Sequence, residues 1–349
     1  MHSNLETINK LRWVKTPVLS DGFICLVDCM GADEDIVQAA RVSYNRHGLS
    51  DSERVLAKLQ SFRKDTILDK ESCKEISAFS DGEIRRAEKA CADDDAKLLR
   101  MLYRQRHTTP FEQCEVKFLI RIPMDAWRQG VRHRTASINE YSTRYTEAID
   151  SRDETPPDGW RLQAKSNKQG SSGLLTEWPE TITQVDSPVT PGEYLSNQES
   201  WFHRVAQGLY QERLEFGIAK EQARKDLPLS TYTELYWKCD LHNIFHFLGL
   251  RMDSHAQLEI RLYANAMFDI VKQLFPIASQ AFLDYRFNAF TMTALDTEVA
   301  KLIGYEVLKP GIARFDQLMQ TVITDKREQD ECRAKFLKMG LIVPNKSEG

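Results

Sequence analysis

The chain has few cysteines and no long apolar stretch. Only seven cysteines occur in 349 residues, the number is odd, and no two form a C-x-x-C pair. Such scattered thiols are typical of a reducing compartment rather than of a disulfide framework. The stretch from Met1 to Trp13 is polar and charged, so we expect no signal peptide. No apolar run approaches the roughly 20 residues that a membrane span needs. We therefore expect a cytoplasmic protein that contacts no membrane.

The chain also lacks an excess of positive charge. It has 47 Lys and Arg against 51 Asp and Glu, a net charge of −4, which gives no bulk attraction to nucleic acid. Between Lys117 and Tyr145, however, six basic residues face two acidic ones, a local charge of +4 that leaves −8 for the rest. A local basic site on an acidic protein suits a small anionic ligand better than a long polyanion.

Hydrophobic periodicity predicts a few strands among many helices. The segments 21–31 and 114–122 have the pattern of short strands. Thr231 and Glu234 have the spacing of a capping box, which predicts a helix that runs through Leu250. Other segments with helical periodicity are 33–45, 199–226, 256–275, 293–307 and 311–338.

Two segments are expected to be irregular insertions. In 51–106, apolar residues at helical spacing flank a polar, acidic middle, and we expect about 51–96 to be a solvated insertion. The segment 151–198 is interrupted by proline and glycine, which predicts a long irregular excursion. The remainder is expected to form a single domain over 1–349, with a helical C-terminal extension at about 290–349.

The most informative stretch is 132–144, which reads R-H-R-x-x-S-x-N-E-x-S-x-R. Arginine presents a planar fork that matches phosphate oxygens, and serine hydroxyls complete an anion site. Glu140 would repel a phosphate, so it suits a sugar hydroxyl or holds the arginines in place. A solvated, salt-bridged helix usually explains such a charge run, but the interleaved His133 and Asn139 favour a binding site. We expect the helix after Pro123 to carry this signature.

Two further clusters contain residues able to do chemistry. The segment from Arg106 to Glu112 precedes the strand that leads to the signature, so the two are expected to converge. The segment from Asp240 to Gln257 has two histidines four residues apart, His242 and His246, which is the spacing of a metal pair. No H-E-x-x-H motif accompanies them, and we expect no metal.

Two alternatives of other classes stay open at this point. One is an RNA- or nucleotide-binding protein that uses the Arg/His segment as a platform, which predicts a steep salt dependence of binding and no bound chromophore. The other is a histidine-based metalloenzyme, which predicts loss of activity on chelation.

These segments together resemble those of flavin-dependent thymidylate synthases. The family carries the 132–144 signature, an H-x-[ST]-P-F-E segment similar to 107–112, and a D-L-H-N-x-x-H-F-L segment similar to 240–248. The resemblance covers about 20–50, 97–147 and 200–285. It departs from the pattern at Gln113, where the family usually has His. It implies an α+β fold in which an antiparallel sheet packs against a helical bundle, without a Rossmann domain, and the chain indeed has no G-x-G-x-x-G motif.

The resemblance also implies an enzyme activity, the reductive methylation of dUMP to dTMP. Methylenetetrahydrofolate would give the carbon, FAD would carry the hydride and NADPH would reduce the flavin. The catalytic residue would be Arg251, which would contact the pyrimidine and stabilise negative charge on the ring. Classical thymidylate synthases use a cysteine nucleophile instead, and no cysteine here has an evident activating partner. The family is a homotetramer with active sites shared between subunits, and no nucleic acid partner is implied.

The resemblance assigns binding residues by position. The dUMP contacts would be Gln129, Arg132, Glu140, Ser142, Thr143, Arg144, Arg224 and Arg251. The cofactor contacts would be Ser43, His107, Thr109, Arg132, His133, Arg134, Glu140, Asp240, His242 and His246.

Overall fold

The computed structural model describes residues 4–42, 50–62, 75–164, 170–180, 189–305, 312–323, 326–339 and 341–342. The chain forms two compact units, Met1–Phe282 and Leu283–Gly349. The second unit covers the stretch predicted as a C-terminal extension; that the chain functions as one domain stays a prediction. No described helix is long and apolar enough to cross a membrane.

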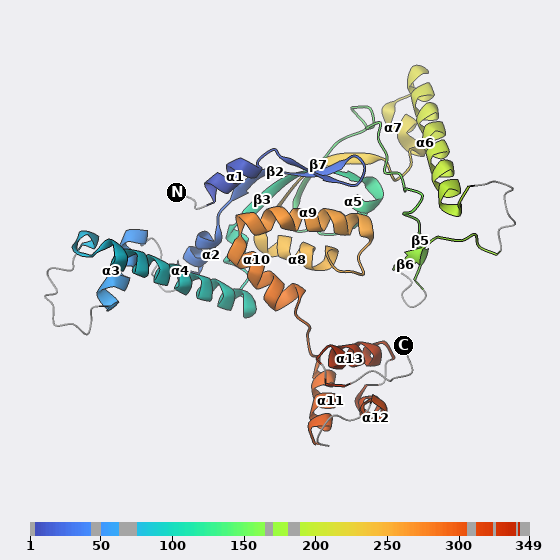
Figure 1. Ribbon diagram of the computed structural model, residues 1–349. Helices are drawn as coiled ribbons and strands as arrows, with labels where there is room; N and C mark the ends of the chain where they lie inside the picture. The colour runs from blue at the N-terminus through green and yellow to red at the C-terminus, as the bar shows by residue number, and fades with distance from the viewer. Residues whose placement is uncertain are drawn as a thin grey trace. The chain divides into compact units, whose positions relative to one another are not determined.

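A five-stranded antiparallel sheet is the centre of the first unit (Figure 1). In spatial order its strands are β1 (Lys15–Val18), β2 (Gly22–Met30), β3 (Glu115–Pro123), β7 (Tyr232–Asp240) and β4 (Ser137–Glu140). β3 and β7 pair along their whole length, from Glu115 opposite Asp240 to Pro123 opposite Tyr232. The α+β prediction is confirmed, and the described residues contain no Rossmann-type parallel sheet.

Alternating side chains explain why the central strands form and which face they bury. In β3 every second residue, from Val116 to Ile122, is buried, while the residues between them are half-exposed. A period of two puts one apolar row on one face of a sheet. Helices lie along one side of the sheet and near its ends (Figure 1). They are α1 (Leu5–Leu11), α2 (Asp33–Arg41), α5 (Met124–Gly130), α8 (Leu241–Arg251), α9 (Leu258–Leu274) and α10 (Pro276–Phe282).

The prediction of a helix from Thr231 through Leu250 is wrong in its first half. Residues 232–240 form β7, and the helix begins only at Leu241. The capping group is Asp240, whose carboxylate accepts the backbone N–H of Asn243 at 2.9 Å. Alternate burial of Leu235, Trp237 and Cys239 against β3 outweighs the local capping pattern, because pairing with β3 satisfies the backbone of the whole segment.

The prediction of an irregular insertion at 51–96 is also wrong for the described part. This region forms α3 (Asp51–Phe62), the short helix η2 (Ile76–Ala78) and most of α4 (Asp81–Arg104). Ser80 and Glu83 form a capping box at the start of α4. Val55, Leu59, Phe79 and Ala87 are buried together. The polar residues therefore lie on the outer faces of packed helices.

The segment 151–198 has little regular structure where it is described. A two-stranded sheet of β5 (Arg161–Gln163) and β6 (Ser171–Leu174) precedes α6 (Pro191–Glu215). α6 therefore begins eight residues before the predicted 199. Short helices η3 (Phe111–Gln113), α7 (Lys220–Ala223) and η4 (Arg224–Asp226) complete the first unit.

The second unit is helical, as its periodicity predicts. It contains the π-helical turn η5 (Leu283–Phe287), α11 (Ala294–Tyr305), α12 (Ile312–Val322) and α13 (Lys326–Lys338). The predicted helix 311–338 is thus two helices. Val299, Phe315, Met319 and Phe336 form a core of their own.

Candidate functional site

The signature residues 132–144 do not lie in a helix, which corrects the sequence-based expectation. α5 ends at Gly130, whose carbonyl oxygen accepts the N–H of His133 at 3.0 Å. The chain then turns and forms the edge strand β4, in which Glu140 pairs opposite Leu235. An edge strand followed by a loop exposes polar side chains and backbone groups to a ligand, which a packed helix would not do.

A cavity of about 580 Å³ lies beside the end of this strand, and we call it the basic cavity. It brings together five of the predicted dUMP contacts: Glu140, Ser142, Thr143, Arg144 and Arg224. Its charged lining consists of four cations, completed by Arg128 and Lys225, and two carboxylates, completed by Glu221. Four positive charges less two negative ones leave +2, which favours an anionic ligand.

The charged side chains of the basic cavity are held in place by neutral or exposed partners, which leave most of their charge uncompensated. Arg224 donates to the hydroxyl of Thr143. Arg144 pairs with Glu221 at 3.2 Å, but both side chains are more than half exposed, so this pair contributes little. The Glu140 oxygens accept from Trp127 Nε1 at 3.1 Å and Thr233 Oγ1 at 3.0 Å rather than from an arginine. Glu140 is thus fixed by neutral donors.

Arg251 and Gln129 lie outside the lining of this cavity but contact each other. Arg251 Nη2 donates to the Gln129 carbonyl oxygen at 2.9 Å, across 122 residues of sequence. Burial lowers the pKa of Arg251, which remains a guanidinium because its ordinary pKa is far above neutrality. The side-chain amide of Gln129 in turn donates to Gln257, for which the sequence had suggested no role.

A cluster of rings joins the signature to α8. His133 is only 8% exposed, and its ring lies 5.6 Å from His246, 5.7 Å from Phe247 and 6.2 Å from Trp237, measured between centroids. Burial and the nearby His246 lower the pKa of His133, so the ring is held neutral. Arg132 and Arg134, on either side of it, are exposed.

The remaining predicted cofactor contacts are more dispersed. His107 and Thr109 are exposed just beyond α4, after a left-handed turn at Arg106 with φ of 61°. Asp240 caps α8, and His242 is half-buried in its first turn. Ser43 lies outside the described residues. Among those described, no three His, Cys, Asp or Glu side chains gather as a metal site.

The described cysteines are poor nucleophiles. Burial raises the pKa of Cys25, Cys91 and Cys239, and raises the pKa of Cys29, Cys114 and Cys332 to about 12. A thiol with such a pKa is protonated at neutral pH and does not attack carbon. Cys73 lies outside the described residues.

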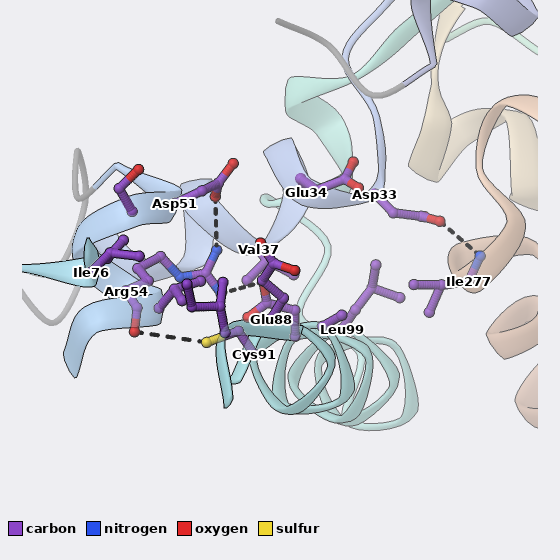
Figure 2. Close-up of a pocket in the computed structure, with 15 residues that line it drawn as sticks. Asp33, Glu34, Val37, Asp51, Arg54, Ile76, Glu88, Cys91, Leu99 and Ile277 are labelled. Atoms are coloured by element: carbon purple, nitrogen blue, oxygen red, sulfur yellow. Dashed lines mark hydrogen bonds and ion pairs between the residues drawn. The ribbon is translucent and has the colours of Figure 1, made fainter. Parts of the chain in front are cut away.

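A second cavity, of about 540 Å³, lies between α2, α3, α4 and the start of α10, and we call it the acidic cavity (Figure 2). Asp33, Glu34, Asp51, Glu88 and Asp95 line it, against the single cation Arg54. None of the predicted site residues lines it. No sequence pattern indicated it, because residues 51–96 were expected to be a solvated, irregular insertion.

Comparisons with known proteins identify the family of the chain. A family model described as "Thymidylate synthase complementing protein" matches residues 25–277. A flavin-dependent thymidylate synthase from Wolbachia pipientis is 36% identical over 94% of this chain and 94% of its own length. One from Thermus thermophilus is 39% identical over 77% of this chain and 78% of its own length.

A solved structure gives the same result for the fold. The UMP/dUMP methylase PolB from Streptomyces cacaoi, bound with 5-Br dUMP, superposes with a TM-score of 0.54 at 28% identity. The alignment covers 78% of this chain and 99% of that one.

Proposed function

The chain belongs to the flavin-dependent thymidylate synthase family, and from this premise we propose that it is the enzyme that methylates dUMP to dTMP. The carbon would come from methylenetetrahydrofolate, the hydride from FAD and the reducing electrons from NADPH. The observation that carries the proposal is the basic cavity, which gathers five predicted nucleotide contacts from the 140–144 loop and from η4.

The basic cavity suits the phosphate and sugar of a nucleotide. Arg144 and Arg224 can give charge-assisted hydrogen bonds to phosphate oxygens, and the Ser142 hydroxyl can add a neutral one. Glu140, held by Trp127 and Thr233, is an acceptor for a sugar hydroxyl. Gln129, Arg132 and Arg251, outside this lining, would then reach the base.

The residues proposed for the flavin fit an anionic, partly planar group. Arg132 and Arg134 are exposed cations, and the exposed ring of His246 lies 5.6 Å from that of His133 and can contact a planar group. His107, Thr109, Asp240 and His242 would add polar contacts, and Ser43 is proposed from its sequence position alone. FAD, when bound, supplies the hydride chemistry.

The chain's own part in the chemistry is electrostatic. C5 of uracil must become nucleophilic, which places negative charge on the ring oxygens and N3. The described cysteines, all with raised pKa, do not supply a thiolate for attack at C6. Arg251, a half-buried cation held by its bond to Gln129, is the group we propose to stabilise that charge.

We further propose that a second copy of the chain covers α6, as expected for a homotetramer. Trp201, Val205 and Leu209 lie at four-residue intervals on one face of α6 and are 59%, 40% and 42% exposed. The opposite face of the same helix buries His203, Ala206 and Tyr210 against the first unit. A row of exposed large apolar side chains is typical of a surface that another protein covers.

The test is to purify the protein and examine its colour. A yellow preparation that NADPH bleaches without air, and that forms dTMP from dUMP and methylenetetrahydrofolate, supports the proposal. A colourless protein that takes up no FAD and makes no dTMP contradicts it.

A further inference from the structure

A chain of hydrogen bonds links Asp125 to the base-contact candidate Gln129. Gln257 Nε2 donates to Asp125 Oδ2 at 3.3 Å, and Gln129 Nε2 donates to Gln257 Oε1. These residues come from different elements: Asp125 and Gln129 belong to α5, and Gln257 caps α9. The bond between the two glutamines spans 128 positions of sequence, so no local pattern would reveal it.

The Asp125 carboxylate determines the orientation of the side-chain amides of Gln257 and Gln129. An ionised carboxylate can only accept hydrogen bonds, so the part of Gln257 that faces Asp125 must be its NH₂ group. With its NH₂ group directed at Asp125, Gln257 turns its oxygen toward Gln129.

The same logic then fixes Gln129. Its NH₂ group faces the oxygen of Gln257, so its own Oε1 faces away. Its backbone is held as well, because its carbonyl oxygen accepts from Arg251 at 2.9 Å. Among the described residues, no protein group donates to Oε1 of Gln129. That oxygen is therefore a positioned acceptor without a protein donor.

We propose that Gln257, oriented by Asp125, is a positioning residue that makes Gln129 present a hydrogen-bond acceptor to the nucleotide. The proposal rests on dUMP being the substrate. Gln129 would select nucleotides that carry a donor at this point and reject those that place an acceptor or nothing there, since an unmet acceptor is costly once water is excluded.

Two groups of dUMP can supply the donor: the ring N3–H and the sugar 3′-hydroxyl. The nucleotide dCMP has an acceptor at N3 and keeps the hydroxyl. The 2′,3′-dideoxy analogue of dUMP keeps N3–H and lacks the hydroxyl. The ratio of the Kd of each analogue to the Kd of dUMP, measured by calorimetry on the flavin-loaded protein, therefore identifies which group Gln129 meets.

The decisive variants differ only in what they offer to Gln129. Gln257→Leu removes the acceptor that fixes the Gln129 amide, so this amide can turn over. We expect the Kd of dUMP to rise about fivefold. The Kd ratio for the analogue that lacks the matching donor should fall about fivefold or more. In Gln257→Glu the new carboxyl lies beside Asp125, and two carboxyl groups this close share a proton. The protonated oxygen can donate to Asp125 while the other oxygen still accepts from the Gln129 NH₂ group, so that ratio should stay at the wild-type value. A merely structural role for Gln257 would not separate these two variants.

The matched control is Gln273→Leu, the same change at an exposed glutamine of α9 that bonds only within its own helix. It should change neither ratio. If the leucine variant does not fold, Gln257→Met carries the same test. Wild-type binding of dUMP together with unchanged ratios in the apolar variant overturns the proposal, and so does an equal loss in Gln257→Glu. Failure of the wild type to bind dUMP overturns the proposed function itself.

Discussion

The basic and acidic cavities have nearly the same volume, about 580 and 540 Å³, and opposite charge. In the acidic cavity two of the carboxylates are already bound by groups of the protein. Asp33 accepts two backbone N–H groups of α10, at 2.7 and 3.0 Å, and Asp95 receives both Arg41 and Arg54. In the basic cavity Arg144 contacts an exposed carboxylate and the ring of Tyr145, and Arg224 donates to a hydroxyl.

The difference shows that cavity size does not identify the site. Asp33 and Asp95 hold helices together, so a change at either should alter stability. The guanidinium groups of the basic cavity can turn to a ligand at little cost, so a change there should alter binding. Four experiments test whether the acidic cavity serves stability and the basic cavity serves binding.

The largest effect is expected for Arg251→Ala. Arg251 bonds to Gln129, whose neighbour Arg128 lines the basic cavity. Removing a preorganised donor of this kind costs about 10² to 10³ in turnover. The rate of dTMP formation should fall by that factor, while the absorbance spectrum should still show bound flavin. Turnover within about threefold of wild type would remove Arg251 from the chemistry.

Next is Asp95→Asn in the acidic cavity. Asp95 is 13% exposed and balances two largely buried arginines, so its loss leaves Arg54 with only the exposed Asp51 and removes the partner of Arg41. We expect the free energy of unfolding of the first unit to fall by about 3 kcal/mol, measured with denaturant, and the Kd of dUMP to stay unchanged. The control is Asp94→Asn, whose more exposed pair with Lys58 should contribute about 0.5 kcal/mol or less. A large change in nucleotide affinity would contradict the division between the cavities.

Arg224→Ala should show the reverse behaviour. Loss of one charge-assisted bond to phosphate should raise the Kd of dUMP about 10- to 50-fold in calorimetry, with little change in the free energy of unfolding. Two controls accompany it: Arg204→Ala on the outer side of α6, and Glu88→Ala in the acidic cavity. Equal weakening by Glu88→Ala would mean that the wrong cavity has been assigned to the nucleotide.

The smallest effect concerns pH. Burial raises the pKa of Asp33 from 3.8 to about 6. Because the folded state binds this proton more tightly than the unfolded state, the stabilising contribution of the protonated form is complete below about pH 4 and is lost as pH rises through 6. The difference in unfolding free energy between wild type and Asp33→Asn should therefore change by about 1 kcal/mol between pH 5 and 7. A difference independent of pH would show that Asp33 does not titrate in this range.

Sequence patterns predicted those elements whose signal is local. Alternation and a following proline located β3, and periodicity located α9 within about two residues of 256–275. The same reasoning failed for β7, because a capping pattern at Thr231 and Glu234 is weaker than strand pairing with β3. For α3 and α4 it found the helical spacing of Val55, Leu59 and Leu99, but it took the polar stretch between them for an irregular insertion.

For the site, the sequence alone determined the chemistry. A run of three arginines, a histidine and serines in 132–144, set in a chain of net negative charge, indicated a small anionic ligand and, by resemblance, the family. The contacts between the site's side chains followed from the tertiary structure alone. It joined the 140–144 loop to Arg224, and Gln129 to Arg251 and Gln257, because these contacts depend on how β7 and the helices α8 and α9 return to α5. Residues more than a hundred positions apart leave no periodic signal of their contact.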